Sequence, residues 1–146
     1  MNILFEKANP QHKEIIFEWL NKPHVMEYWD NSDAHRNDIC IFLEGRRIHS
    51  KYFDGAFSYW IGLINEEPYC LIMTSEIIKD KALPKLWNDN LSKTGKTISI
   101  DFCIGHEKFL GSGHAAPTLE AFTKFYNTQI DPTADTFFID PDENNF

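Results

Sequence analysis

The stretch between residues 97 and 126 constrains the fold of this chain more than any other part of its sequence. Thr97–Ile104 is rich in β-branched residues and alternates in polarity, which is the pattern of a strand. A loop with Gly111 and Gly113 follows, and residues 115–126 then have the pattern of a helix. Glycines at a helix start let the main chain approach a ligand, and the free N–H groups there bind phosphate. This order predicts a phosphate cradle; a glycine turn without a ligand is the alternative.

Two common phosphate-binding motifs do not fit the segment. Gly111-Ser-Gly113-x-x-Ala116 has the letters of the dinucleotide fingerprint, but that fingerprint follows directly on the first strand of several βα units. Here six residues separate the strand from the glycines, and little more than one strand follows the helix. A Walker loop requires Lys-Ser or Lys-Thr after its last glycine, whereas His114 stands there.

Bulk properties narrow the class of protein. At 146 residues with 42% hydrophobic side chains, we expect one folded domain with a real core. The net charge of −8 disfavours nucleic acid and anionic membrane as partners and is compatible with a cationic substrate, although solubility alone also explains mild acidity. No apolar run reaches the roughly 18 residues of a membrane span, and the N-terminus lacks the order of a signal peptide. Cys40, Cys70 and Cys103 lack metal-ligand spacing, so we expect reduced thiols, no metal site and a cytoplasmic protein.

The rest of the chain predicts alternating strands and helices. The expected strands are Asn2–Glu6, Phe57–Ile64, Pro68–Ile77 and Thr136–Asp140, the middle two forming an antiparallel hairpin. The expected helices run from the Asn9 cap and Pro10 to Leu20 and from Ser32 or Asp33 to Ile48, with an aromatic turn at Pro23–Asp30 and a loop at Lys79–Lys96. The predicted inward positions of these helices are Ile15, Ile16, Trp19, Leu20, Ile39, Phe42, Leu43 and Ile48.

Three further motifs carry a resemblance to a known family. Residues 18–29 read E-W-L-N-K-P-H-V-M-E-Y-W, the fourth strand contains Ser99-Ile100-Asp101, and the chain closes with Asp140-Pro141-x-x-x-Asn145. With Lys108-Phe-Leu-Gly111-Ser-Gly113, close to the signature Gln/Arg-x-x-Gly-x-Gly/Ala but with Lys in first place, the chain resembles the GNAT superfamily of acetyl-CoA-dependent N-acetyltransferases. It is most similar to the aminoglycoside 6'-N-acetyltransferases and their siderophore-acylating relatives. The resemblance covers nearly the whole chain and implies an α/β (α+β) fold with a mixed, mostly antiparallel sheet flanked by helices.

The resemblance implies acetyl-CoA as cofactor and a small-molecule amine as acceptor, with direct attack of the amine on the thioester. Main-chain groups of Cys103 and Ile104 would hold the pantetheine arm. The amine would lie near Trp29, Asp101 and Asp140. The pyrophosphate would be wrapped by the loop formed by Lys108, Phe109, Leu110, Gly111, Ser112, Gly113 and His114.

Elementary chemistry supports Asp101 as the catalytic residue. An ammonium group must lose a proton before it attacks, so a nearby carboxylate serves both binding and base catalysis. Asp101 interrupts an apolar strand, but alternation puts it on one face with Ser99 and Cys103, so an outward-facing residue is the alternative. Trp29 could stack on a sugar or cover a cation, or could anchor the core. Asp140 could equally be a turn residue before proline.

The family pattern continues past residue 146 with an Arg-Ala-x-x-x-Tyr helix and a last strand, and its tyrosine is thought to protonate the departing thiolate. Because losing a general acid costs about 10²–10⁴ in rate, we expect weak activity from a domain incomplete at its C-terminus, or a homo-oligomer that covers the open edge. A stable, soluble monomer in sedimentation would exclude the oligomer. The leading function is acetylation of an aminoglycoside 6'-amine. The alternatives are acylation of a siderophore hydroxylamine and a non-catalytic coenzyme-A-binding module.

Overall fold

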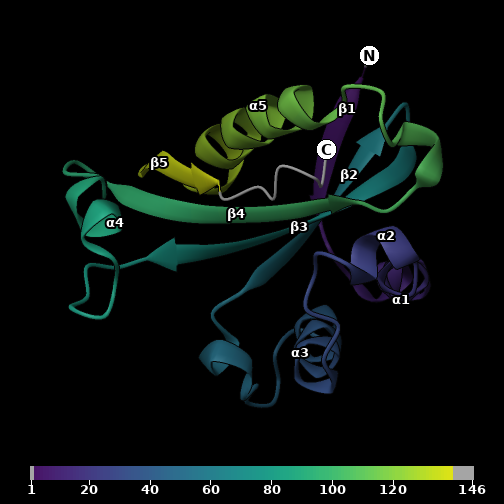
Figure 1. The fold of residues 1–146 in the computed structure, drawn as a ribbon, viewed down its shortest axis with the longest axis horizontal. Helices are drawn as coiled ribbons and strands as arrows, with labels where there is room; N and C mark the ends of the chain where they lie inside the picture. Colours follow the sequence, from purple (N-terminus) through teal and green to yellow (C-terminus); the bar gives the residue numbers. More distant parts are fainter. Residues whose placement is uncertain (1, 140–146) are drawn as a thin grey trace.

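A five-stranded sheet separates two helical layers in the computed structural model, which describes residues 2–139 (Figure 1). The strands lie in the order β1-β2-β3-β4-β5, with β4 and β5 parallel and the other pairs antiparallel. This mixed, mostly antiparallel sheet confirms the predicted fold class. The strands are β1 (Ile3–Lys7), β2 (Ser58–Ile64), β3 (Glu67–Ile77), β4 (Lys96–Ile104) and β5 (Ala134–Ile139).

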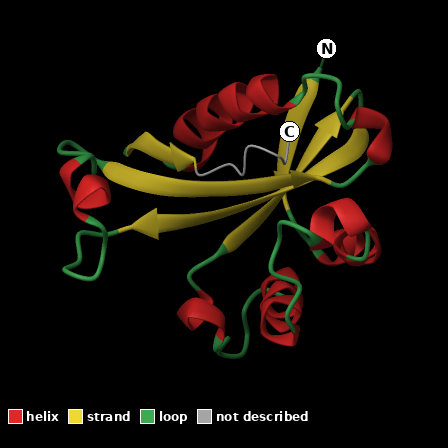
Figure 2. Ribbon diagram, viewed as in Figure 1, coloured by secondary structure: helices red, strands yellow, loops and turns green. Residues whose placement is uncertain are grey.

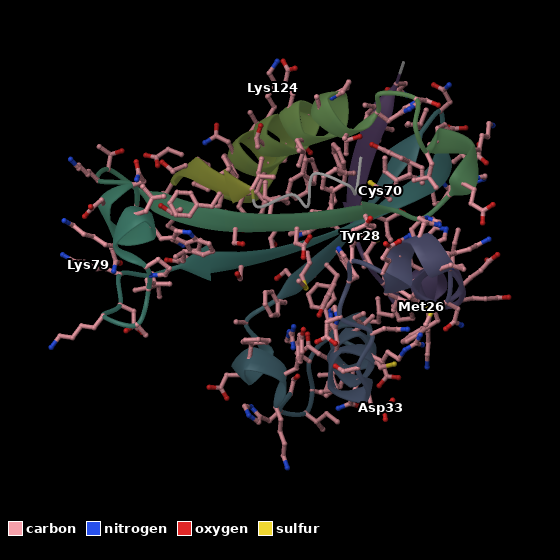
Figure 3. The ribbon with its side chains drawn as sticks, viewed as in Figure 1. Met26, Tyr28, Asp33, Cys70, Lys79 and Lys124 are labelled. Atoms are coloured by element: carbon pink, nitrogen blue, oxygen red, sulfur yellow. The ribbon has the colours of Figure 1, made fainter. Side chains whose placement is uncertain are left out.

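Helices cover both faces of the sheet (Figure 2). Three of them lie together on one face, and α5 lies along the other, with Lys124 pointing away from the sheet (Figures 1 and 3). The short helix α4 lies at the far end of β3 and β4 (Figure 1). The helices are α1 (Lys13–Leu20), α2 (Pro23–Met26), α3 (Asp33–Leu43), α4 (Lys85–Asp89) and α5 (Ala115–Phe125), with 3-10 turns at Pro10–His12, Tyr52–Gly55 and Glu107–Phe109 and a π turn at Tyr126–Ile130.

Each face of the sheet has its own apolar core, because successive strand residues point to opposite sides. The core under α1–α3 includes Ile16, Trp19, Leu20, Trp29, Ile39, Phe42, Tyr59, Ile61, Leu71 and Cys103. The core under α5 includes Trp60, Tyr69, Cys70, Ile72, Ile98, Ile100, Phe102, Phe109 and Phe122. These cores fix the strand register, since a slip by one residue would exchange the two faces.

Several local predictions are confirmed. The Asn9 side chain accepts a hydrogen bond from the Gln11 N–H and caps the first helical segment, as expected from Asn-Pro. The β2–β3 hairpin turns through Asn65 and Glu66, whose φ angles of 50° and 70° are the left-handed backbone conformation that a two-residue hairpin turn requires. Glu66 adopts this conformation without the glycine or asparagine that usually marks it.

The second helix ends earlier than predicted. Gly45, with φ 89°, takes the left-handed conformation that terminates helices, so α3 stops at Leu43 rather than Ile48. Ile39, Phe42 and Leu43 are buried as expected, but Ile48 is exposed, and its predicted inward position is wrong.

Two segments predicted as irregular contain helices. Pro23–Met26 within the aromatic turn forms α2, with Pro23 at its first position. The Lys79–Lys96 loop contains α4, which begins after Pro84, and its Trp87 packs edge-on against Phe138 of β5 at 5.8 Å. Both helices are one turn or little more, and no periodic pattern marks so short an element.

The first helix and the last strand also differ from prediction in their bounds. Residues 10–12 form a 3-10 turn, and the α-helix proper begins at Lys13. The last strand begins at Ala134, and Asp140 lies outside the described residues. Within residues 2–139, no helix has the length and apolarity needed to cross a bilayer.

Candidate active site

Asp101 lies on the open part of the sheet face that carries α1–α3. The register pairs it with Met73 on β3, and Ser99 and Cys103 on the same face pair with Ser75 and Leu71. Cys103 is covered by the core, whereas Asp101 is exposed. The alternation expected for β4 is therefore confirmed, and the outward position brings the carboxylate to a surface that a ligand can reach.

Trp29 donates a hydrogen bond to the Asp101 carboxylate from the core side of the sheet face. Its indole Nε1–H donates to Asp101 Oδ1 at 3.2 Å, and the rest of the side chain is buried in the core, with 5% of it exposed. Its sequence neighbour Tyr28 lies where α2 meets the sheet (Figure 3). Trp29 thus anchors the core and orients Asp101, and a contact of its ring face with a substrate stays a prediction.

The glycine loop presents main-chain donors at the start of α5. The N–H groups of residues 111–114 make no hydrogen bond to any residue in 2–139. Gly111 and Gly113 have φ angles of 68° and 73°, and a Cβ at either would meet nothing within 4 Å, so open space lies before the loop. Helix α5 adds its positive end, and its N-cap His114 makes no side-chain capping bond. This set of donors fits the pyrophosphate of coenzyme A.

Side chains of this loop serve mainly to hold it. Lys108 Nζ pairs with Glu67 Oε2 at 3.3 Å, and Glu67 Oε1 also lies 3.0 Å from His106 Nε2. Phe109 is buried against Tyr69 and His114, with ring centroids 5.5 and 5.3 Å apart. The hydroxyl of Ser112 donates to the Leu110 carbonyl at 3.3 Å. The pyrophosphate contacts of these residues stay a prediction, and with their side chains engaged it falls to their main-chain N–H groups.

The end of β4 sets the geometry predicted for the pantetheine arm. The Gly105 N–H bonds to the Tyr69 carbonyl, so strand alternation directs the main-chain groups of Cys103 toward β3 and those of Ile104 away from it. The Ile104 carbonyl accepts a hydrogen bond from His24 Nε2 at 2.9 Å. Of the two predicted residues, Ile104 has the orientation that a ligand alongside β4 requires.

Two residues beside Asp101 were missed by sequence reasoning. The Tyr52 hydroxyl donates to Asp30 Oδ2 at 2.8 Å, and the Ser32 N–H donates to Asp30 Oδ1 at 2.9 Å. Desolvation opposes ionisation of Asp30, but the hydrogen bonds from Ser32 and Tyr52 outweigh it and hold the pKa of Asp30 below its usual value. Burial, Asp30, Asp38 and Asp101 together raise the pKa of Tyr52. The only sequence signal was a polar Asp-Asn-Ser run after an aromatic stretch.

Two of the three cysteines, Cys70 and Cys103, are unsuited to nucleophilic catalysis. Burial raises the pKa of Cys70 to about 12 and that of Cys103 well above its usual value, so neither thiol ionises near neutral pH. Among residues 2–139, no group of three or more His, Cys, Asp or Glu side chains is placed to hold a metal ion. The candidate site therefore combines a carboxylate on the sheet with main-chain donors at a helix start.

Comparison with known proteins identifies the class. A family model described as an acetyltransferase (GNAT) domain matches residues 9–146, and the chain belongs to this family. Members of the family use acetyl-CoA, so the chain is placed among the acetyl-CoA-dependent N-acetyltransferases. No curated protein sequence matches the chain.

Solved structures show the same fold. Aminoglycoside N(6')acetyltransferase from Legionella pneumophila has a TM-score of 0.67 and 21% identity, over 99% of this chain and 74% of that chain. AAC(6')-Ib in complex with coenzyme A and kanamycin has a TM-score of 0.66 and 17% identity, over 99% and 77%. An uncharacterised protein from Bacillus halodurans has a TM-score of 0.65 and 20% identity, over 98% and 67%.

Proposed function

We propose that this chain transfers the acetyl group of acetyl-CoA to an amine of a cationic small molecule, with an aminoglycoside 6'-amine as the first candidate. The position of Asp101 carries the proposal. Asp101 is exposed on the open sheet face of β4, and the same strand leads directly into the loop whose N–H groups fit a pyrophosphate. Similarity of fold to aminoglycoside acetyltransferases supports the acceptor class.

The chemistry divides between the two parts of the site. Acetyl-CoA supplies an acetyl thioester when bound. The N–H groups of residues 111–114 would bind its pyrophosphate, and the Ile104 main chain would align the arm beside β4. Asp101 would bind the acceptor ammonium and take its proton. The freed amine nitrogen would then bond to the acetyl carbon as the carbon–sulfur bond breaks. The sulfur would leave with the electron pair and be protonated from solvent, and the nitrogen would release its second proton to solvent to give the neutral amide.

The Trp29–Asp101 hydrogen bond has a defined part in this scheme. A neutral donor at 3.2 Å holds the Asp101 carboxylate in a defined orientation without neutralising its charge. Trp29 is therefore a positioning residue, and Asp101 is the group that touches the acceptor.

The proposal is tested by following thiol release from acetyl-CoA with kanamycin as acceptor. The variant Asp101→Asn keeps the size of the side chain but cannot take a proton, so we expect kcat/KM for the acceptor to fall about 10²-fold or more. Coenzyme A affinity, measured by calorimetry, should stay unchanged. Asp33→Asn, an exposed carboxylate at the start of α3, is the control for the change in charge.

Three outcomes would contradict the proposal. Thiol release with a hydroxylamine acceptor and not with an amine would favour siderophore acylation. Coenzyme A binding without any thiol release would favour a non-catalytic module. Full activity of the Asp101→Asn variant would remove Asp101 from the mechanism.

A further inference from the structure

The segment between α3 and β2, residues 44–57, places aromatic side chains beside the candidate acceptor site. Tyr52 and Phe53 meet edge-on at 4.8 Å, and Phe57 closes the group at 5.4 Å from Phe53. Phe53 is 66% exposed although it is a large apolar residue. Its φ of 47° and the φ of 54° at Asp54 are left-handed conformations that bulky residues rarely adopt. The backbone thus holds a largely exposed aromatic ring in an unfavourable conformation.

His35 fixes the position of Tyr52. Its imidazole stacks on the Tyr52 ring at 4.7 Å and 10°, and its Nδ1 hydrogen-bonds to the Asp30 carbonyl at 2.7 Å. His35 is fully buried, yet its Nε2 has no hydrogen-bond partner among residues 2–139. A buried polar atom without a partner is costly and uncommon in a packed core. The buried imidazole thus supports the Tyr52 ring by stacking on it and holds the Asp30 main chain through its Nδ1.

Asp30 is held by that arrangement but remains exposed. Both of its carboxylate oxygens accept hydrogen bonds from neutral donors, the Tyr52 hydroxyl and the Ser32 N–H. Arg36 in α3 is bound to Asn21 and Asn31. Arg46, which follows the helix, is bound to Asp38. The negative charge of Asp30 is thus fixed in place and directed at solvent.

Asp30 and Asp101 belong to one region of the surface. Trp29, adjacent to Asp30 in the chain, donates to Asp101. Tyr52, which donates to Asp30, lies in the field of both carboxylates. A ligand whose amine meets Asp101 can therefore extend past Trp29 toward Asp30 and toward Phe53, whose ring contacts that of Tyr52.

We propose that Asp30, held by Tyr52 and flanked by Phe53, is a specificity-determining residue that binds a second ammonium group of the acceptor. The inference rests on the proposed function and narrows it, because it requires an acceptor with at least two cationic groups. A carboxylate beside an exposed aromatic ring suits this class, since a cation is attracted by the carboxylate and by the ring face. Tyr52 is a positioning residue that acts through Asp30.

The test compares two acceptors that differ in charge. Kanamycin carries several ammonium groups, whereas 6-amino-6-deoxyglucose carries one, and thiol release from acetyl-CoA reports on both. In the Asp30→Asn variant, we expect KM for kanamycin to rise about tenfold with kcat unchanged. KM for 6-amino-6-deoxyglucose and coenzyme A affinity should change less than about twofold. Tyr52→Phe keeps the ring and should raise KM for kanamycin in the same direction by a smaller factor.

Asp54→Asn is the matched control, because it removes one carboxylate charge at an exposed position in the aromatic segment that packs beside Tyr52. Equal effects of Asp30→Asn on both acceptors, or an equal effect of Asp54→Asn on kanamycin, would overturn the inference. Absence of thiol release by the unmodified chain would overturn the proposed function instead. Calorimetry with kanamycin then decides the inference alone. About tenfold weaker binding to the Asp30→Asn variant supports it, and equal or undetectable binding to both proteins overturns it.

Discussion

The carboxylate of Asp38 and the guanidinium of Arg46 form a bidentate ion pair next to the segment that carries Tyr52. Nη1 lies 2.8 Å from Oδ1, and Nη2 lies 3.4 Å from Oδ2. Asp38 is completely buried, and its Oδ2 also accepts from the Tyr59 hydroxyl at 2.6 Å. Arg46 donates further to the Phe57 carbonyl. This pair ties α3 to the start of β2 across the segment that carries Tyr52.

Removing the charge of Asp38 should destabilise the fold strongly. Asp38→Asn leaves the Arg46 guanidinium without its partner, and breaking a buried pair in this way costs about 3–5 kcal/mol in the free energy of unfolding. Urea unfolding followed by fluorescence at pH 7 measures this loss. Glu44→Gln, an exposed change at the end of α3, should cost less than about 0.5 kcal/mol. A loss below about 1 kcal/mol for Asp38→Asn would show that the pair contributes little.

The same residue should make stability depend on acid. Burial opposes ionisation of Asp38, but hydrogen bonds from Arg46, Ser50 and Tyr59 outweigh it and hold the pKa of the folded carboxyl below its usual value. A lowered pKa contributes stability above the unfolded-state pKa of about 3.9, and this contribution is lost as pH falls through the folded-state pKa. Unfolding free energies between pH 6 and pH 2.5 should therefore fall more steeply for the unmodified chain than for Asp38→Asn. Parallel curves would contradict the assignment.

The sequence predicted strand β4 and the glycine loop of the site, but not the contact between Asp30 and Tyr52 beside them. Alternation along β4 was enough to place Asp101, Ser99 and Cys103 on one face, because a strand has a fixed period. The glycine loop was placed by its position between a strand and a helix. Asp30 and Tyr52 were not found, since their contact joins residues 22 positions apart through the stacking of a buried histidine.

The mispredicted elements have causes that a periodic pattern does not contain, one local and one tertiary. Ile48 fitted the helical period of its segment, but Gly45 ends the helix before the chain reaches Ile48. Helix α4 packs through Trp87 against Phe138, which is distant in sequence. Tertiary contacts of this kind outweigh the propensity of a short segment.

The glycine loop should bind coenzyme A less tightly when Gly113 is replaced. Gly113→Ala strains the main chain at φ 73° and puts a methyl group into the space before the N–H donors. We expect coenzyme A affinity to weaken about tenfold in calorimetry. Gly45→Ala imposes similar strain at φ 89° in a turn far from β4 in sequence, so it should lower the melting temperature comparably without affecting coenzyme A. Unchanged binding by Gly113→Ala would count against the pyrophosphate assignment.

The two buried thiols, Cys70 and Cys103, should stay unreactive in the folded chain. Cys70 and Cys103 are buried and have raised pKa values, whereas Cys40 is partly exposed. An aromatic disulfide reagent should modify one cysteine natively and all three in urea, and mass spectrometry identifies the site. Cys103→Ser should retain acetyl transfer, since no acyl-enzyme is expected. Loss of transfer in that variant, with coenzyme A binding intact, would instead indicate a covalent intermediate.

The hydrogen bond from Trp29 to Asp101 should matter for acetyl transfer and not only for folding. Trp29→Phe retains an aromatic ring in the core but removes the indole N–H that orients the carboxylate. Trp60→Phe is a close match on the opposite sheet face, because Trp60 is equally buried and its indole N–H donates to Thr74 at 2.9 Å.

Both variants should lose about 1–3 kcal/mol of stability, from the smaller ring and the missing hydrogen bond. Only Trp29→Phe should lower kcat/KM for the acceptor, by about tenfold, because a less ordered Asp101 takes the proton less efficiently. Coenzyme A affinity should be unaffected in both. Equal losses of kcat/KM in the two variants would show that Trp29 acts through stability alone, and the positioning role would then be withdrawn.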